Sequence, residues 1–253
     1  MYMRVGAQLY TVYDYCQSLK DLSETLQKIA DIGYTTVHVS GTCDFEAEWL
    51  AEELKKAGLT CGITHYDDSR IYGDTENVIR EHDIFSCDYI GISGIPGGFE
   101  AIPQFPATAK KIALKMQAAG KKLMYHNHSW EYESRCADGR SVMEFLAEEI
   151  PASLMGFTLD FYWLKYGGAD PLFEISRLNG RLDCVHLKDM LDAESRKMCW
   201  VGNGTVMDYS KIVSALADAG TQFAFVEQDT CYGENPFDCL KKSYAYLKSL
   251  GLQ

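Results

Sequence analysis

Four ionisable residues stand at or just beyond the ends of short apolar runs in the second half of the chain: Glu131, Asp160, His186 and Glu227. The intervals between them are 29, 26 and 41 residues, which suits successive strand–helix units rather than a local finger or loop site. Three carboxylates and an imidazole directed into one cavity would repel one another without a cation. An oxygen-rich set with one nitrogen suits Mn²⁺, Co²⁺ or Mg²⁺, and Zn²⁺ is also compatible. The pattern predicts a divalent-metal site.

Each of these residues also has an ordinary structural interpretation. Asp160 alone could cap the next helix, and Glu227 alone could pair with Lys188. A single histidine at a strand end is more often hydrogen-bonded structure than a ligand. Their joint occurrence in consecutive units favours the metal site over a charged network without a metal.

The elements that would position these residues recur along all 253 residues. Eight apolar runs are typical of strands: Arg4–Tyr10, Thr35–Ser40, Leu59–His65, Tyr89–Ser93, Lys122–His126, Met155–Asp160, Leu182–His186 and Phe223–Glu227. Helical patterns lie between them and end at Gly33, Gly58, Gly120 and Gly220, and helix starts are indicated at Thr75, Ser141, Asp208 and Asn235-Pro236. We therefore predict one (β/α)8 TIM-barrel domain over residues 1–253, in which the strand ends meet at one mouth.

Further polar and aromatic residues follow the same strand ends. His65, His128 and Lys188 could carry protons or stabilise an oxyanion, or they could only orient ligands and form ion pairs. Five residues could form the wall that binds substrate or could be ordinary core: Gln8, Tyr10, Tyr66, Trp130 and Trp163.

Composition narrows the class of partner and the compartment. The chain has 24 basic and 36 acidic residues and a net charge of −12, which argues against binding to nucleic acid and against binding to an anionic membrane surface. Its nine cysteines show no C-x-x-C spacing, and we expect reduced thiols rather than disulfides. We find no signal peptide and no membrane span, so we expect a cytoplasmic protein.

Several motifs carry a family resemblance: Tyr125-His126-Asn127-His128-Ser129-Trp130-Glu131, Leu159-Asp160-Phe161-Tyr162-Trp163, Gly168-Ala169-Asp170-Pro171, His186-Leu187-Lys188-Asp189, Gly202-Asn203-Gly204 and Glu227-Gln228-Asp229. With these motifs in this order, the chain resembles the xylose-isomerase-like barrels, and within them the subgroup that has a His-Asn-His segment followed by glutamate. That family includes sugar isomerases and epimerases, inosose dehydratases and apurinic-site endonucleases. The resemblance implies a metal held by Glu131, Asp160, His186 and Glu227, with His128 as the alternative ligand on strand five. His38 stands where many relatives have a glutamate.

The resemblance and the polar strand ends together predict a metal-dependent isomerase or epimerase. It would act on a small, sugar-like ketose or keto-polyol, with Glu131 or Glu227 removing a proton next to the carbonyl. The main alternative is a dehydratase or lyase acting on a keto-inositol or 3-keto-glycoside. An apurinic-site endonuclease and a non-catalytic sugar-binding barrel are further alternatives. Because we find no Arg/Lys cluster beyond Arg70, Lys165 and Lys188, we expect a substrate without phosphate. The sequence is also compatible with a homo-oligomer.

Overall fold

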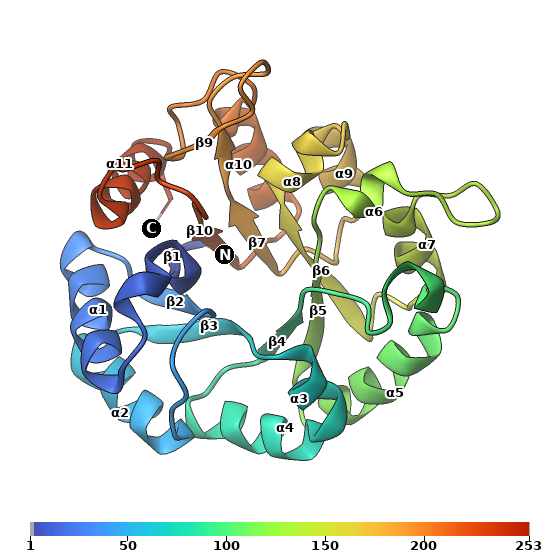
Figure 1. Cartoon of the computed structure of the whole chain (residues 1–253), viewed down its shortest axis with the longest axis horizontal. Coiled ribbons are helices and arrows are strands. Elements are labelled where there is room, and N and C mark those ends of the chain that lie inside the picture. The colour runs from blue at the N-terminus through green and yellow to red at the C-terminus, as the bar shows by residue number, and fades with distance from the viewer. Residues whose placement is uncertain (1–2, 253) are drawn as a thin grey trace.

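The computed structural model describes residues 3–252, and eight parallel strands form a closed barrel at its centre (Figure 1). These strands are β1 (Arg4–Gln8), β2 (Thr36–Val39), β3 (Thr60–His65), β4 (Tyr89–Ile92), β5 (Lys122–His126), β6 (Met155–Asp160), β7 (Cys184–Leu187) and β10 (Phe223–Val226). The barrel closes because β1 pairs with both β2 and β10: Gly6 lies opposite Thr36 on one side and Phe225 on the other. The (β/α)8 architecture is confirmed.

The barrel interior is filled by a small cluster of apolar side chains, one or two from each of five strands. They are Ile63, Tyr89, Met124, Cys184, Phe223 and Phe225. Because neighbouring side chains of a strand point to opposite faces, the alternate residues pack outward against the helices instead. Inward-facing residues beyond this cluster, at the carboxyl ends of the strands, therefore lie in the mouth.

Helices form a ring around the barrel (Figure 1). The helices are α1 (Leu19–Ile32), α2 (Ala47–Ala57), α3 (Asp68–Gly73), α4 (Thr75–Ile84), α5 (Phe105–Ala118), α6 (Trp130–Glu133), α7 (Val142–Glu149), α8 (Phe161–Tyr166), α9 (Pro171–Arg177), α10 (Tyr209–Asp218) and α11 (Pro236–Ser249), with 3-10 turns η1 (Leu9–Tyr15) and η2 (Gly98–Ala101). Helix α1 shows the common pattern: Leu22, Leu26 and Ile29 are buried toward the barrel, and Gly33 ends the helix with a φ of 118°.

Most of the expected boundaries hold. Seven of the eight predicted strand runs contain a whole barrel strand, and β7 extends one residue past its predicted end to Leu187. Ser141, Asp208 and Asn235 accept the capping hydrogen bonds of α7, α10 and α11. Thr75 is the first residue of α4 rather than its cap, and its hydroxyl donates to the Ile71 carbonyl at 2.8 Å.

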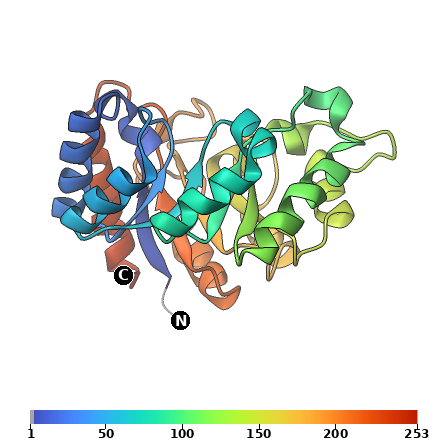
Figure 2. The same ribbon diagram turned by 90° about the horizontal axis from the view of Figure 1, so that it is seen from below.

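The loops after the strands carry the elements that the sequence patterns did not reveal. A small antiparallel pair, β8 (Asp189–Met190) and β9 (Met198–Cys199), follows β7. Two residues per strand are too few to show a period, so no pattern indicated them. In the side view of Figure 2, the beginning of β1 and the end of α11 lie on the lower side. No helix within residues 3–252 combines the length and the apolar character needed to cross a membrane.

Candidate metal centre

Four buried side chains converge at the carboxyl ends of β5, β6, β7 and β10. His126, Asp160, His186 and Glu227 each offer one ligand atom, and these four atoms all lie within 4.8 Å of one another. Asp160 and His186 are register partners on adjacent strands, and Glu227 directly follows β10. Two imidazole nitrogens and two carboxylate oxygens at this spacing can hold one divalent cation.

The alternation of side chains along β5 explains why His126 is the member from that strand. Met124 belongs to the barrel interior, Tyr125 packs outward against Phe105 of α5, and His126 faces inward again. His126 Nε2 lies 3.4 Å from Asp160 Oδ2. Asp160 uses its other oxygen, Oδ1, to accept the Trp163 amide at 2.9 Å, so one carboxylate both caps α8 and faces the centre.

Glu131, which we predicted as a metal ligand, lies outside this group in the structure. Glu131 lies on α6, beyond the end of β5, and its carboxylate is fully buried. Its Oε1 accepts the Tyr125 hydroxyl at 2.9 Å, and its Oε2 accepts the His128 amide at 2.8 Å. Because Tyr125 points to the outer face of the barrel, the carboxylate bound to it is turned away from the mouth. The alternative ligand, His128, is also absent from the group.

Burial raises the pKa of Glu131 from 4.5 to about 7, so the folded state favours the neutral acid. This contribution to the free energy of unfolding is complete below pH 4.5 and is lost as the pH rises through about 7. We expect Glu131→Gln, which mimics the neutral acid, to gain about 2–3 kcal/mol relative to the wild type between pH 5 and pH 8. Urea unfolding of both proteins in the presence of EDTA measures this. Glu133→Gln, at an exposed position on the same helix, should show no such change. If the free energy of unfolding changed equally with pH in Glu131→Gln and in the wild type, Glu131 would not have a raised pKa in the folded state.

The atoms that face one another in the centre have the chemistry of ligands rather than of a hydrogen-bonded pair. His186 Nδ1 lies 2.8 Å from Glu227 Oε2, yet both atoms are buried and neither makes a hydrogen bond of normal geometry. The other ring nitrogen, His186 Nε2, is 2.9 Å from His38 Nδ1, which fixes the ring orientation. The donor set therefore fits a metal ion, and the contact with His38 orients His186 as a ligand.

Lys188 supplies the fixed positive charge beside this group. Its Nζ lies 3.1 Å from Asp160 Oδ2, 2.9 Å from Glu227 Oε2 and 2.9 Å from Asp229 Oδ1, and the side chain is almost fully buried. When all three carboxylates are ionised and His186 is neutral, the one ammonium leaves two negative charges, which is the charge that one divalent cation would balance.

The pKa shifts follow from these contacts. Burial alone would raise the pKa values of Asp160 and Glu227, but the Lys188 ammonium and the neighbouring imidazoles hold both well below their usual range. Burial and the positive charge on neighbouring His186 lower the pKa of His126 to about 3, which keeps this ring neutral. Burial also opposes protonation of His186, but Glu227 and Asp160 raise its pKa to about 9. A cation at Nδ1 needs the neutral ring, so a proton and a cation compete for that atom.

The neighbouring residue Asp189 has a structural role: it holds the loop that contains Gly202 and Gly204. Its carboxylate accepts the amides of Gly202 at 2.9 Å and Gly204 at 3.1 Å, and it does not pair with Lys188. A Cβ at Gly204 would lie 2.2 Å from the Met190 carbonyl oxygen, so only glycine fits there. The Gly202-Asn203-Gly204 motif is thus the loop that closes over Asp189.

A cavity of about 470 Å³ opens over the metal-ligand group, a volume typical of small-molecule sites. Most of the predicted site residues line it: Gln8, Tyr10, His65, Tyr66, His128, Trp163, Lys188 and Glu227. Trp130 is absent from the lining and packs partly buried against the apolar core. Ser40, Ser93 and Asp229 also line the cavity and were not predicted as site residues.

The His65 ring occupies the space left by the missing side chain of Gly91 on the next strand. A Cβ at Gly91 of β4 would lie 1.9 Å from the His65 ring, so the imidazole occupies the place of a side chain there. The His65 ring centroid is 4.4 Å from that of His38 and 5.4 Å from that of His126. His65 thus stands beside the centre without belonging to the ligand group.

Two residues escaped the sequence prediction although a signal was present. His126 is the last residue of the run Lys122–His126, just as Asp160 and His186 end theirs, and the same rule of strand ends would have selected it. Asp229 lies two residues after Glu227, and its carboxylate contacts Lys188. Burial and the charge of Glu227 raise the pKa of Asp229 to about 7.

The sequence matches the family described as "Xylose isomerase-like TIM barrel" over residues 26–250. The chain therefore belongs to the xylose-isomerase-like TIM barrels. No protein with a curated description matches it.

Solved structures with the same fold cover nearly the whole chain. One is a sugar phosphate isomerase/epimerase from Parabacteroides distasonis (TM-score 0.82, 19% identity, 97% of this chain and 98% of the other). A second is a family 2 AP endonuclease from Brucella melitensis (0.74, 17%, 97% and 99%). A third is a probable 3-DHS dehydratase from Bacillus anthracis (0.73, 17%, 97% and 99%). At these identities the likeness shows the fold, which carries several reaction classes.

Proposed function

We propose that this protein is a divalent-metal-dependent isomerase or epimerase that acts on a sugar-like ketose or keto-polyol. The observation that carries the proposal is the convergence of two imidazoles, two carboxylates and the Lys188 ammonium under one polar cavity at the barrel mouth. Family membership and the isomerase/epimerase among the structural relatives agree with it.

His126, Asp160, His186 and Glu227 would hold the metal. Two nitrogens and two oxygens favour Mn²⁺, Co²⁺ or Zn²⁺ over Mg²⁺, which prefers oxygen ligands and water. When bound, the ion would supply Lewis-acid polarisation of a carbonyl and so acidify the neighbouring C–H bond.

The proton transfer falls to Glu227, because Glu131 is turned away from the cavity and engaged by Tyr125 and His128. Burial would raise the pKa of Glu227, but Lys188 and His186 hold it below its usual range, so the carboxylate is in the ionised form that a base requires. Lys188, whose Nζ contacts both Glu227 and Asp229, can donate a hydrogen bond to the oxyanion that develops. Return of the proton to the adjacent carbon, with the hydroxyl proton passing from one oxygen to the other, would give an isomer. Delivery of a proton to the opposite face by a second group of the cavity lining, such as His65 or His128, would give an epimer.

Incubation in D₂O with Mn²⁺ and a panel of ketoses, keto-inositols and 3-keto-glycosides tests this proposal. We expect one class of sugar to gain deuterium at the carbon next to its carbonyl and to yield an isomeric product, detected by NMR and mass spectrometry. His186→Ala is the inactive control, because it removes one donor of the metal-ligand group. A product that has lost water would instead assign a lyase. No exchange and no product with any member of the panel would overturn the proposal.

A further inference from the structure

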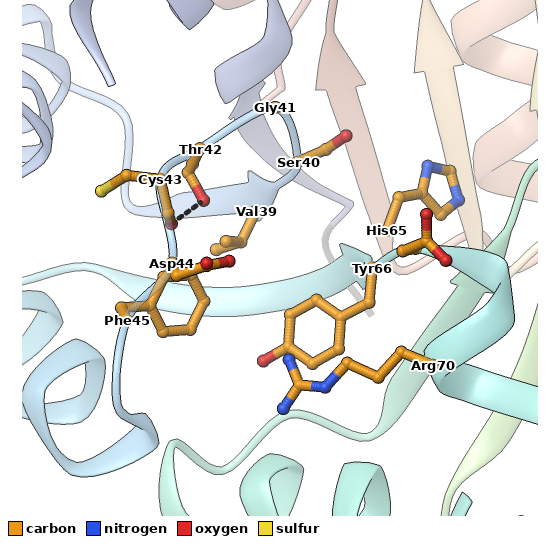
Figure 3. Close-up of a pocket in the computed structure, with 11 residues that line it drawn as sticks. Val39, Ser40, Gly41, Thr42, Cys43, Asp44, Phe45, His65, Tyr66 and Arg70 are labelled. Carbon is orange, nitrogen blue, oxygen red and sulfur yellow. Dashed lines mark hydrogen bonds between the residues drawn. The ribbon is translucent and has the colours of Figure 1, made fainter. Parts of the chain in front are cut away.

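A second cavity of about 480 Å³ adjoins the one over the metal-ligand group (Figure 3). It lies over the loops that follow β2 and β3. The two cavities share four lining residues: Ser40, His65, Tyr66 and Asp67. They therefore form one cleft with two lobes, which we call the catalytic lobe, over His126 and Glu227, and the outer lobe, lined by the loop from Val39 to Phe45 and by Arg70.

The outer lobe has the chemistry of a binding site rather than of a second reaction centre. Among the described residues, the one group of clustered metal-ligand side chains lies under the catalytic lobe. The outer lobe instead presents the oxygens of Thr42 and Asp44 together with the rings of Phe45 and Tyr66, whose centroids are 6.2 Å apart (Figure 3). Hydrogen-bonding oxygens beside aromatic rings suit a sugar, which offers hydroxyl groups along with apolar C–H surfaces.

The charges of the outer lobe favour a neutral ligand over a phosphate. Asp44 and Asp67 contribute carboxylates, and Arg70 is the one cationic residue in its lining. The Arg70 guanidinium forms an ion pair with Glu81 and lies 4.6 Å above the Tyr66 ring. A phosphate would meet two carboxylates and one guanidinium that is already paired.

The wall of the outer lobe is fixed from behind by the segment around η1. The Cys43 amide donates to the Cys16 carbonyl at 2.7 Å, and Gln17 Nε2 donates to the Gly41 carbonyl at 3.1 Å. Gly41 has a φ of 68°, and a Cβ there would lie 2.7 Å from the Tyr10 ring. The loop is thus shaped before any ligand binds, which lowers the entropic cost of binding.

We propose that the outer lobe binds a neutral glycosyl group attached to the keto-sugar in the catalytic lobe, so that the preferred substrate is a keto-disaccharide rather than a free monosaccharide. This inference rests on the proposed function. Each lobe has a volume in the range of sites for one small ligand, and the shared residues Ser40 and Tyr66 would flank the glycosidic link.

The test compares matched sugars in the deuterium-exchange assay with Mn²⁺: D-fructose against isomaltulose, turanose and lactulose, and 3-keto-glucose against 3-keto-trehalose. We expect kcat/KM for at least one disaccharide to exceed that of its monosaccharide by at least tenfold. Asp44→Trp should remove this advantage and leave monosaccharide turnover within twofold of the wild type. The exposed Asp44 lines only the outer lobe and forms no hydrogen bond or ion pair with another residue of the described range 3–252. Glu48→Trp, exposed on α2 and outside both linings, is the matched control.

Calorimetric binding of the same sugars to the same three proteins separates the two proposals. Equal turnover of monosaccharides and disaccharides, unchanged in Asp44→Trp, would overturn the outer-lobe inference and leave the isomerase proposal intact. If no sugar exchanges deuterium, the isomerase proposal fails, and the calorimetric affinities alone test whether the outer lobe binds a glycosyl group. Disaccharides that bind no more tightly than monosaccharides, or equally well to Asp44→Trp, would overturn it.

Discussion

Glu227→Gln should lower kcat by roughly 10²- to 10⁴-fold, measured at saturating Mn²⁺, while the protein stays folded. The substitution keeps the shape of the side chain but removes the charge that His186 and Lys188 face at 2.8 and 2.9 Å. It removes both a metal-ligand oxygen and the carboxylate that would accept the proton from carbon. We therefore expect weaker metal binding in addition to the loss of kcat.

Glu234→Gln is the matched control, because Glu234 lies in the same loop after β10, is exposed, and pairs with Lys242 away from the cavity. It should retain wild-type kcat. A Glu227→Gln protein with kcat within threefold of the wild type at saturating metal would remove Glu227 from the proton transfer.

Lys188→Met should destabilise the metal-free protein by about 3–5 kcal/mol, the range expected when a buried charge loses its partner. Lys188 Nζ contacts Asp160, Glu227 and Asp229, and its loss would leave two buried carboxylates and one partly buried carboxylate with no fixed cation. A divalent ion that binds the same oxygens should restore most of that stability. Urea unfolding with EDTA and with Mn²⁺ measures both effects.

Lys211→Met provides the comparison, since the Lys211–Asp208 pair is 3.1 Å long but largely exposed, and such pairs contribute at most about 1 kcal/mol. If Lys188→Met were as stable as Lys211→Met in EDTA, the Lys188 ammonium would not be what balances the buried carboxylates. If Mn²⁺ failed to stabilise Lys188→Met, the carboxylates would not share a cation.

The barrel could be predicted from the sequence because its strands and helices repeat signals that each element carries by itself. Every strand run ends in polar residues, and four helices are followed by a glycine with positive φ that permits the chain to turn back, at Gly33, Gly58, Gly120 and Gly220. The short pair β8–β9 carries no such local signal, because its geometry depends on contacts with the Asp189 carboxylate.

Three members of the metal-ligand group, Asp160, His186 and Glu227, were among the predicted ligands, and the different place of Glu131 has a physical cause. Asp160 ends β6, His186 is the last residue but one of β7, and Glu227 follows β10 directly, so their direction follows from strand alternation. Glu131 follows its strand by several residues, and its direction depends on the fold of α6 and on the Tyr125 hydroxyl. A residue type that suits a metal does not reveal which face of the barrel it reaches once the chain has left the strand.

Titration of the purified metal-free protein with Mn²⁺, followed by elemental analysis of dialysed samples, tests the four-residue centre most directly. We expect one ion per wild-type chain and unchanged binding in Glu131→Gln. In His126→Ala we expect binding to be weakened more than the roughly 10- to 100-fold that is lost with a merely supporting contact. An ion that is lost in Glu131→Gln but retained in His126→Ala would contradict the four-residue centre.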